Sequence, residues 1–330
     1  MNKIEEKTNL FIKKKPRTFG YSTNGNIIYN IKDARIPLFR LKEWDFFQIV
    51  SENFTMFMII GHVSYATSLN FTIYDFKQNK TYYVGKLLPF KKVKLEDHPN
   101  NDCKVAYQSK KFKIEMETKN KDRYFHLEAD DKTLGKCLVD IKMEPRNNGI
   151  LVATAFEDDK QFYLNNKMCL LKPSGKATLG DINYHLDDNC YGIVDWGRGY
   201  LPFSHQWIWG SGAGLVNGKY FGFNIGKFGN NENGSENIFY YDNKEYKMNT
   251  VEISLNEDNV YDKWHYKSDN GNFVFEMKPL YDNHTKTKVL FVDNECHQMF
   301  GKFYGYIIVD NEKIEISDFF AFTEIAHNRW

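Results

Sequence analysis

The chain has 330 residues, and its 44 Lys plus Arg balance 43 Asp plus Glu to a formal net charge of +1. This balance excludes a nucleic-acid binder that relies on bulk electrostatics and a broadly basic protein of membrane surfaces. Hydrophobic residues make up 42% of the chain, which excludes global disorder, and the aromatic share of 16% favours strands and apolar cavities.

The segment Met1 to Arg17 is charged and lacks the apolar stretch of a signal peptide. No run of about 18 uncharged apolar residues occurs, so the sequence predicts no membrane span. Five cysteines without a C-x-x-C pair lie at Cys103, Cys137, Cys169, Cys190 and Cys296. We expect a cytoplasmic protein with reduced thiols, no cofactor and no nucleic-acid partner, and we leave its oligomeric state open.

Alternating apolar and polar residues predict strands along the chain, most clearly at 112–117, 137–143, 251–256 and 313–317. Successive side chains of a strand point to opposite faces, so a strand that is buried on one face needs this alternation. Two segments, Leu41–Val50 and Phe319–His327, fit either a helix or a strand.

Residues that tolerate positive φ separate the predicted strands, for example Asn217-Gly218, Asp242-Asn243 and Asp310-Asn311. Such pairs are typical of tight antiparallel hairpins. Hairpins in chain order, without long amphipathic helices between them, predict an all-β protein with little helix, whose meandering strands close into barrels.

The least patterned stretch, residues 174–189, is rich in Gly, Asn and Asp. We place a domain junction there, which divides the chain into residues 1–180 and 181–330. The second unit carries a Trp/Gly-rich motif, and we expect its polar segment Gly229–Asn237 to be a surface loop.

That motif is the densest group of candidate functional residues. Asp195-Trp196-Gly197-Arg198-Gly199 is followed by Ser204-His205-Gln206-Trp207-Ile208-Trp209-Gly210-Ser211-Gly212. One interpretation is an aromatic-walled pocket on which ionisable groups converge. The other is a turn between domains, in which Asp195 pairs with Arg198 and the glycines allow tight packing.

Motifs for nucleotides, nucleophilic catalysis and metals fit poorly. The segment Gly210–Gly214 lacks the G-x-G-x-x-G spacing, and Trp209 replaces the first Gly of G-x-S-x-G. The nine histidines are dispersed, and Cys296 and His297 are adjacent, which is not a ligand spacing. We therefore predict no metal site.

As a set, several motifs resemble an uncharacterised bacterial domain-of-unknown-function family, and the likeness runs from about Arg40 to Trp330. The motifs are Leu41-Lys42-Glu43-Trp44, Asp195–Gly199, Trp207–Gly212, Ser235-Glu236-Asn237 and Asn328-Arg329-Trp330. That family is similar to the AttH/CrtC-like superfamily, which includes carotenoid 1,2-hydratase, tocopherol cyclase and fungal Diels–Alder cyclases. The resemblance implies two tandem lipocalin-like antiparallel β-barrels, with an apolar cleft at or near their interface.

In the hydratase branch, the resemblance implies an Asp-His-Glu-Trp-like pocket segment and a carboxylic acid that protonates a carbon–carbon double bond. The similar segment here, Ser204–Trp207, keeps the His and the Trp and replaces both acidic positions. Tyr240-Tyr241-Asp242 is similar to a downstream Tyr-x-Asp element of that branch, although Asp242 also fits a hairpin turn.

Three functions are open at this point. The first is binding of an isoprenoid-, polyketide- or lipid-like molecule through Trp196, Arg198, Trp207, Trp209 and Tyr240. The second is a metal-free hydratase, cyclase or isomerase, in which Asp195 or Asp242 donates a proton, His205 orients the acid and tryptophan faces stabilise positive charge. The third is a protein-interaction module, which requires exposed tryptophans. An Asp195 neutralised by Arg198 would be a structural strut, whereas an Asp195 in an apolar cavity would favour catalysis.

Overall fold

The computed structural model describes residues 1–229, 234–289 and 292–329. The centre of the predicted loop Gly229–Asn237 and the closing Trp330 lie outside these residues. Across the described ranges strands dominate, there is no α-helix, and the one helical element is the 3-10 turn η1 (Ile31–Asp33). None of the described residues forms a helix that is long and apolar enough to cross a membrane. The prediction of an all-β protein is confirmed.

The first of two large sheets has 13 strands. They are β4 (Gly20–Ser22), β6 (Leu41–Val50), β7 (Phe54–His62), β8 (Ala66–Asp75), β9 (Lys80–Pro89), β10 (Cys103–Ser109), β11 (Phe112–Lys119), β12 (Asp122–Asp131), β13 (Gly135–Pro145), β14 (Ile150–Ala155), β15 (Phe162–Leu179), β16 (Ile182–His185) and β17 (Tyr191–Tyr200). The main path is β10-β11-β12-β13-β15-β17-β6-β7-β8-β9, while β14 and β16 pair with β15, and β4 pairs with β14.

The second sheet has nine strands in the order β21-β20-β19-β18-β26-β25-β24-β23-β22. They are β18 (Ser204–Val216), β19 (Lys219–Lys227), β20 (Ile238–Tyr241), β21 (Lys244–Lys247), β22 (Val251–Ser254), β23 (Trp264–Ser268), β24 (Phe273–Val289), β25 (Val292–Val309) and β26 (Glu312–Arg329). Two small pairs complete the structure: β1 (Thr8–Asn9) with β5 (Ile27–Ile28), and β2 (Phe11–Ile12) with β3 (Lys15–Pro16).

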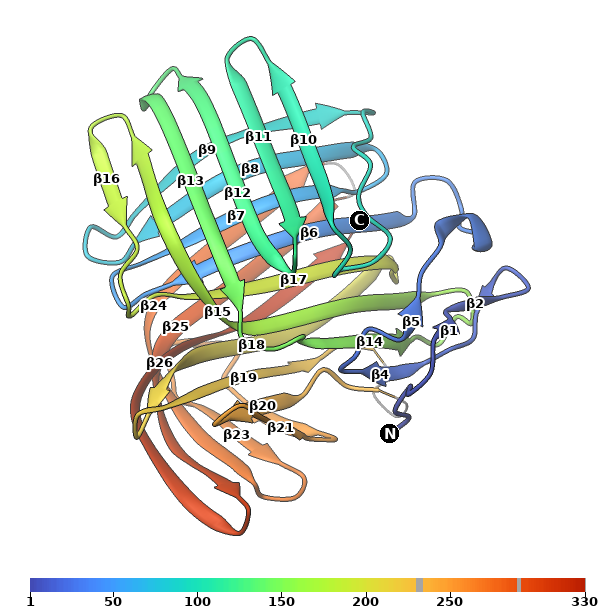
Figure 1. Cartoon of the computed structure of the whole chain (residues 1–330), viewed down its shortest axis with the longest axis vertical. Coiled ribbons are helices and arrows are strands. Elements are labelled where there is room, and N and C mark those ends of the chain that lie inside the picture. Colours follow the sequence, from blue (N-terminus) through green and yellow to red (C-terminus); the bar gives the residue numbers. More distant parts are fainter. Residues whose placement is uncertain (230–233, 290–291, 330) are drawn as a thin grey trace.

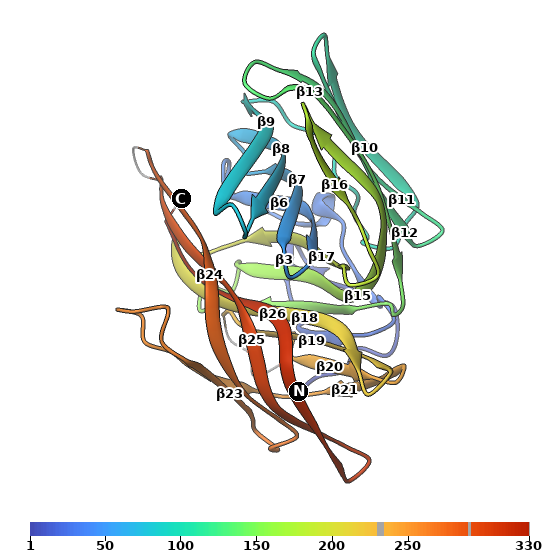
Figure 2. The same cartoon turned by 90° about the vertical axis from the view of Figure 1, so that its left-hand side faces the viewer.

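Both large sheets curl, and each is packed against the other across its convex side, as the two views in Figures 1 and 2 show. Their strands pair antiparallel throughout, mostly between chain neighbours, as the predicted hairpins require. Each sheet therefore encloses its own core and shares a third core with its neighbour.

The two ambiguous segments are both strands. Leu41–Val50 is β6, which pairs with β7 and β17, and Phe319–His327 lies within β26, which pairs with β18 and β25. Residues 46–50 and 320–326 are buried on both faces, apart from the half-buried Phe46 in the first strand. Burial on both faces removes the alternation of apolar and polar residues by which a half-buried strand is recognised.

The chain passes from the first sheet to the second between Tyr200 and Ser204. Strand β17 is paired over its whole length with β6, and with β15 on its other edge, so it belongs to the first sheet. The change of sheet thus comes later than the predicted division at 180/181. Residues 174–189, where we placed the junction, form the end of β15 and the strand β16.

The described residues form four apolar clusters: three belong to the two large sheets, and a smaller fourth lies between the N-terminal segment and strands β14, β15 and β17. The first sheet encloses a cluster that includes Phe71 and Phe125, and the second encloses a cluster rich in phenylalanine around Trp264. Side chains of both sheets form the third cluster, the inter-sheet core, in which Phe76 of the first sheet stacks on Tyr281 at 4.6 Å and lies 4.9 Å from Phe300. Apolar side chains fill the interior of each curled sheet. Functional groups from the two sheets therefore meet in the region between them.

We expect Phe76→Ala to lower the free energy of unfolding by about 3–5 kcal/mol, because the substitution opens a cavity between two sheets that relax only partly. Phe76 is 3% exposed. Urea unfolding followed by tryptophan fluorescence measures the change. Phe90→Ala is the matched control: Phe90 is 82% exposed, and its substitution should change stability by no more than about 0.5 kcal/mol. Equal losses for the two variants would contradict the assignment of the inter-sheet core.

Candidate functional site

A buried ion pair lies between the two sheets. Lys167 of β15 and Asp195 of β17 are directly paired in register, and Nζ of Lys167 is 2.9 Å from Oδ2 of Asp195. The Lys167 side chain is 4% exposed. Its ammonium also lies 3.9 Å from the ring centroid of Trp209, which belongs to β18 of the second sheet. One cation therefore interacts with groups of both sheets.

Two further carboxyl groups approach the same region from the second sheet. Glu324 of β26 accepts hydrogen bonds from Nε1 of Trp207 at 2.7 Å and from Nε2 of Gln298 at 2.9 Å. Glu236, which precedes β20, accepts one from Nδ2 of Asn165 at 2.9 Å. Asp195, Glu236 and Glu324 all interact electrostatically with the ammonium group of Lys167, and we call these four residues the acid cluster.

Burial dominates the electrostatics of the acid cluster. Removal from water raises the pKa of Glu236 and of Glu324 above the ordinary value, and the nearby Lys167 offsets only part of this effect. For Lys167, burial lowers the pKa, but the attraction of Asp195 and Glu236 outweighs it, so the net pKa is raised. Lys167 can neutralise one carboxylate, and the remaining carboxyl groups are held toward their protonated form.

Aromatic side chains form a half-exposed rim beside the acid cluster. His205 stacks on Trp207 at 5.6 Å, and Phe228 lies within 5.3 Å of the His205 ring and 5.2 Å of the Tyr163 ring. Trp44 stacks on Tyr163 at 5.5 Å. Burial lowers the pKa of His205, whose Nδ1 lies 2.9 Å from the carbonyl of Pro202. The rim thus places aromatic ring faces beside the buried carboxyl group of Glu324.

Two glycines make room for the site. A Cβ on Gly197 would lie 2.2 Å from the Trp44 ring, and one on Gly226 would lie 2.0 Å from Oε1 of Glu236. Both distances are shorter than any real carbon contact, so a side chain at either position would displace the ring or the carboxyl group. Close approach of a site residue thus explains the glycine at 197 in the sequence motif.

Asp195 does not pair with Arg198, which corrects one of our two interpretations. Residues three apart on a strand point to opposite faces, and Nη2 of Arg198 instead lies 2.9 Å from Oδ1 of Asp45. Trp196 shares the face of Arg198, whose guanidinium lies 4.1 Å from the Trp196 ring. Trp196 and Arg198 are therefore turned away from the acid cluster, whereas Asp195, His205, Trp207 and Trp209 gather at it.

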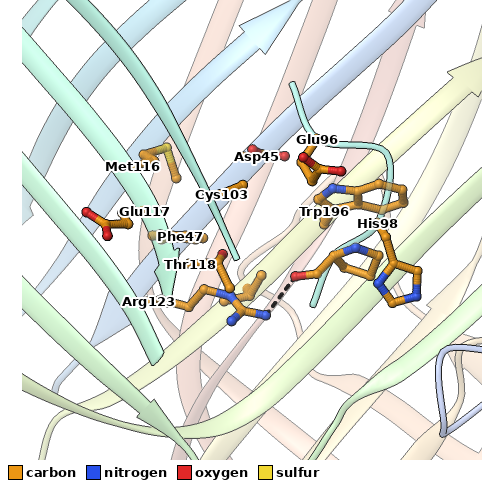
Figure 3. Close-up of a pocket in the computed structure, with 12 residues that line it drawn as sticks. Asp45, Phe47, Glu96, His98, Cys103, Met116, Glu117, Thr118, Arg123 and Trp196 are labelled. Atoms are coloured by element: carbon orange, nitrogen blue, oxygen red, sulfur yellow. Dashed lines mark hydrogen bonds between the residues drawn. The ribbon is translucent and has the colours of Figure 1, made fainter. Parts of the chain in front are cut away.

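Trp196 lines a different, water-sized cavity of about 20 Å³ inside the first sheet. Figure 3 shows this cavity between Asp45, Cys103 and Arg123, with the Arg123 guanidinium directed at the carbonyl of Pro99. The cavity is too small for an organic ligand.

The remaining predicted site residues also lie outside the acid cluster. Tyr240 is buried in the inter-sheet core, beside Leu170 and Cys169. Asp242 lies in the turn between β20 and β21, where its half-exposed carboxylate pairs with Lys219 at 2.7 Å. Its φ of 51° is the conformation that the hairpin turn demands.

Sequence reasoning missed Lys167, Glu236, Glu324 and Tyr163 as site residues. One signal was present: Lys167 is the lone charge in residues 162–171, all of which are buried, and Glu324 is the lone charge in the run 319–326. A charged residue inside a long apolar strand needs a partner. Only long-range pairing shows that these two residues lie near one another.

A groove of about 1160 Å³ opens elsewhere along the junction of the sheets. Leu170, Tyr191, Ala213 and Phe320, which belong to the inter-sheet core, form part of its wall. Of the five tryptophans that the structure describes, none is exposed. The exposed aromatic patch that a protein-interaction module requires is thus not made by the described tryptophans.

Fold and site together define a two-sheet β protein with a buried acid cluster between its sheets. The chain belongs to the family described as "Domain of unknown function (DUF2804)", whose model matches residues 1–330. A comparison with curated proteins finds no match.

Solved structures share the fold. The crystal structure of CghA superposes with a TM-score of 0.58 at 7% identity, covering 98% of this chain and 97% of CghA. CghA with Sch210972 gives 0.53 at 7% identity, with 88% of each chain covered. Kievitone hydratase from Nectria haematococca gives 0.52 at 12% identity, covering 96% and 98%. The predicted fold of two antiparallel β units in tandem is confirmed, with each barrel present as a curled sheet.

We expect Lys167→Met to lower the free energy of unfolding by about 3–5 kcal/mol, because it leaves Asp195 buried without its cation. Adding Asp195→Asn should restore part of the loss, since no uncompensated charge then remains at that pair. Urea unfolding of both variants and of the double variant gives the coupling. Strictly additive losses would contradict the pairing.

The raised pKa of Glu324 predicts how stability depends on pH. A carboxyl group whose pKa is higher in the folded state binds a proton more tightly there, so its contribution is fully present below the unfolded value of about 4.3 and is lost as pH rises through the folded value. Glu324→Gln should therefore make the fall in stability above this pH less steep. Chemical unfolding at several pH values measures the slope, and the exposed Glu312→Gln should leave it unchanged.

Proposed function

We propose that this protein binds an apolar, unsaturated small molecule between its sheets and acts on it as a proton-transfer hydratase or cyclase. The single observation that carries the proposal is the excess of buried carboxyl groups over cations beside tryptophan rings. Asp195, Glu236 and Glu324 lie near one another, and Lys167 is the cation within this cluster. Burying more carboxyl groups than cations lowers the stability of the folded protein. Carboxyl groups with raised pKa values cluster at functional sites.

Glu324 is the proton donor in this proposal. It is 8% exposed, and burial raises its pKa, so it keeps its proton to a higher pH than a carboxyl group in water does. The hydrogen bonds from Trp207 and Gln298 hold its position. Asp195 pairs with Lys167, and its role is to fix the ammonium.

The chemistry needs only a proton and a nucleophile. The Glu324 hydroxyl gives its proton to one carbon of a double bond, and the other carbon becomes a cation. The faces of Trp207 and Trp209 stabilise such a cation by roughly 0.5–2 kcal/mol each. Water, or a second double bond of the same molecule, then adds to the cation, and the released proton returns to the Glu324 carboxylate.

The fold supports this choice of chemistry. One structure that shares it is named as a hydratase, and another is a complex with the small molecule Sch210972. Identities of 7% and 12% make these likenesses of fold, so the residues of this chain must carry the argument for function.

Binding without turnover is the second candidate function. Ser204 and Gln206 stand where the hydratase-like segment has acidic residues, and the aromatic rim serves a carrier as well as an enzyme. The two functions differ in whether a proton from solvent becomes bonded to a carbon atom of the ligand.

We expect an isoprenoid alcohol such as geranylgeraniol to quench the tryptophan fluorescence of the purified protein saturably. Native mass spectrometry should detect any apolar molecule that co-purifies with the protein. Incubation of the bound molecule in D₂O should place solvent deuterium on its carbon. Glu324→Gln should keep binding and slow deuterium incorporation by about 10²–10⁴-fold, the usual contribution of a general acid.

Asp242→Asn is the matched control, because this carboxylate lies in an exposed turn and should leave both binding and incorporation unchanged. Saturable binding without deuterium incorporation in the unsubstituted protein would favour the carrier. A protein that neither co-purifies with an apolar molecule nor responds to isoprenoids and fatty acids would overturn both candidate functions.

A further inference from the structure

A pair of histidines faces each other across the long hairpin of β24 and β25, outside the acid cluster. His284 and His297 occupy directly opposed register positions, and their rings stack at 4.1 Å with an angle of 4° between the planes. Directly opposed side chains in an antiparallel pair have Cβ atoms about 4.5–5.5 Å apart, close enough for both rings to reach one ion.

A carboxylate completes a set of three ligand atoms. Glu295 lies two residues before His297 on the same face of β25, and its Oε1 is 2.9 Å from Nε2 of His284. One ligand atom from each of His284, Glu295 and His297 lies within 4.8 Å of the other two. Bonds of about 2.0–2.1 Å to a tetrahedral zinc ion place ligand atoms nearer together than this, so modest side-chain rotation would bring the three into position.

A second carboxylate orients one of the rings. Oδ2 of Asp282 is 2.7 Å from Nδ1 of His297, and the Asp282 side chain is 11% exposed. Because a carboxylate accepts and does not donate, Nδ1 carries the proton and Nε2 keeps its lone pair for a metal. The other oxygen of Asp282 is buried and has no hydrogen-bond partner among the described residues. Carboxylate–histidine pairs of this kind orient zinc ligands in proteins.

We propose that His284, His297 and Glu295 form a binding site for a divalent transition-metal ion, with zinc the ion that best suits two imidazoles and one carboxylate. Asp282 is the positioning residue of the site. On binding, zinc takes the place of the proton that His284 Nε2 shares with Glu295, and that proton moves to the other ring nitrogen or to water. Three protein ligands leave the fourth position to water.

Lys286 holds the remaining carboxylate oxygen. Its Nζ lies 2.7 Å from Oε2 of Glu295, so Oε1 stays directed at the histidine pair. The site is also connected to the acid cluster by one strand: His297 and Gln298 are neighbours on β25, and Gln298 donates to Glu324 from the opposite face. A metal bound at His297 would therefore fix the segment of β25 that presents Gln298.

Isothermal titration of the full chain with zinc chloride tests the proposal. We expect saturable binding of one zinc ion per chain, a zinc-dependent rise in the unfolding midpoint, and intense visible absorption with cobalt(II) that marks a tetrahedral site. His284→Ala and His297→Ala should abolish all three signals. Asp282→Asn should weaken zinc binding by about 10–100-fold, as loss of such a carboxylate partner does in known sites.

His126→Ala is the matched control, because His126 also lies on a strand between two carboxylates, Asp140 and Glu128, but in the first sheet. The His126→Ala variant should bind zinc as the unsubstituted protein does. Circular dichroism of each variant checks folding, and Lys288→Ala, at an exposed position of the same hairpin that pairs with Asp293, supplies a variant that should still bind zinc. Absence of saturable zinc binding, binding that survives His297→Ala, or binding that disappears on alkylation of the cysteines would overturn the proposal.

Discussion

The arrangement of the site depends on one ammonium group. Nζ of Lys167 lies 2.9 Å from Asp195, 3.9 Å from the centre of the Trp209 ring, and near two carboxyl groups that come from the second sheet. Without this cation, three carboxyl groups would face one another in a region with little water. With it, one carboxylate is paired, while burial raises the pKa of Glu236 and of Glu324 above the ordinary value. The same group thus interacts with both sheets and lies near Glu324, the residue that donates the proton in the proposed chemistry.

Strand geometry explains why charge is distributed in this way. In β17 the side chain of Asp195 points toward the second sheet, with Gly197 on the same face, while the side chains of Trp196 and Arg198 face the interior of the first. Each buried charge therefore finds a partner on its own side: Lys167 for Asp195, and Asp45 for Arg198. Burial of a charge requires such a partner. The tight spacing around Gly197 and Gly226 then determines where Trp44 and Glu236 can lie.

Much of the fold could be predicted, since alternation and turn residues report local geometry that the chain carries in its own sequence. Leu41–Val50 and Phe319–His327 were ambiguous because strands buried on both faces lose the alternation. Asp195, His205, Trp207 and Trp209 could be singled out because they lie in one dense motif. Lys167 and Glu324 could not be connected, because only the pairing of distant strands and the stacking of two sheets bring them together. The histidines 284 and 297 were missed for the same reason, since a hairpin register decides that they are opposite.

The position of Lys167 over Trp209 has a spectroscopic consequence. An ammonium 3.9 Å from an indole ring shifts the energy of its excited state, because excitation redistributes charge within the ring. The wavelength of maximum fluorescence emission of Trp209 therefore depends on the position of the ammonium relative to the ring. Among the described tryptophans, Trp209 is a built-in optical probe of the acid cluster, and its spectrum would follow a guest molecule or a proton without any attached dye.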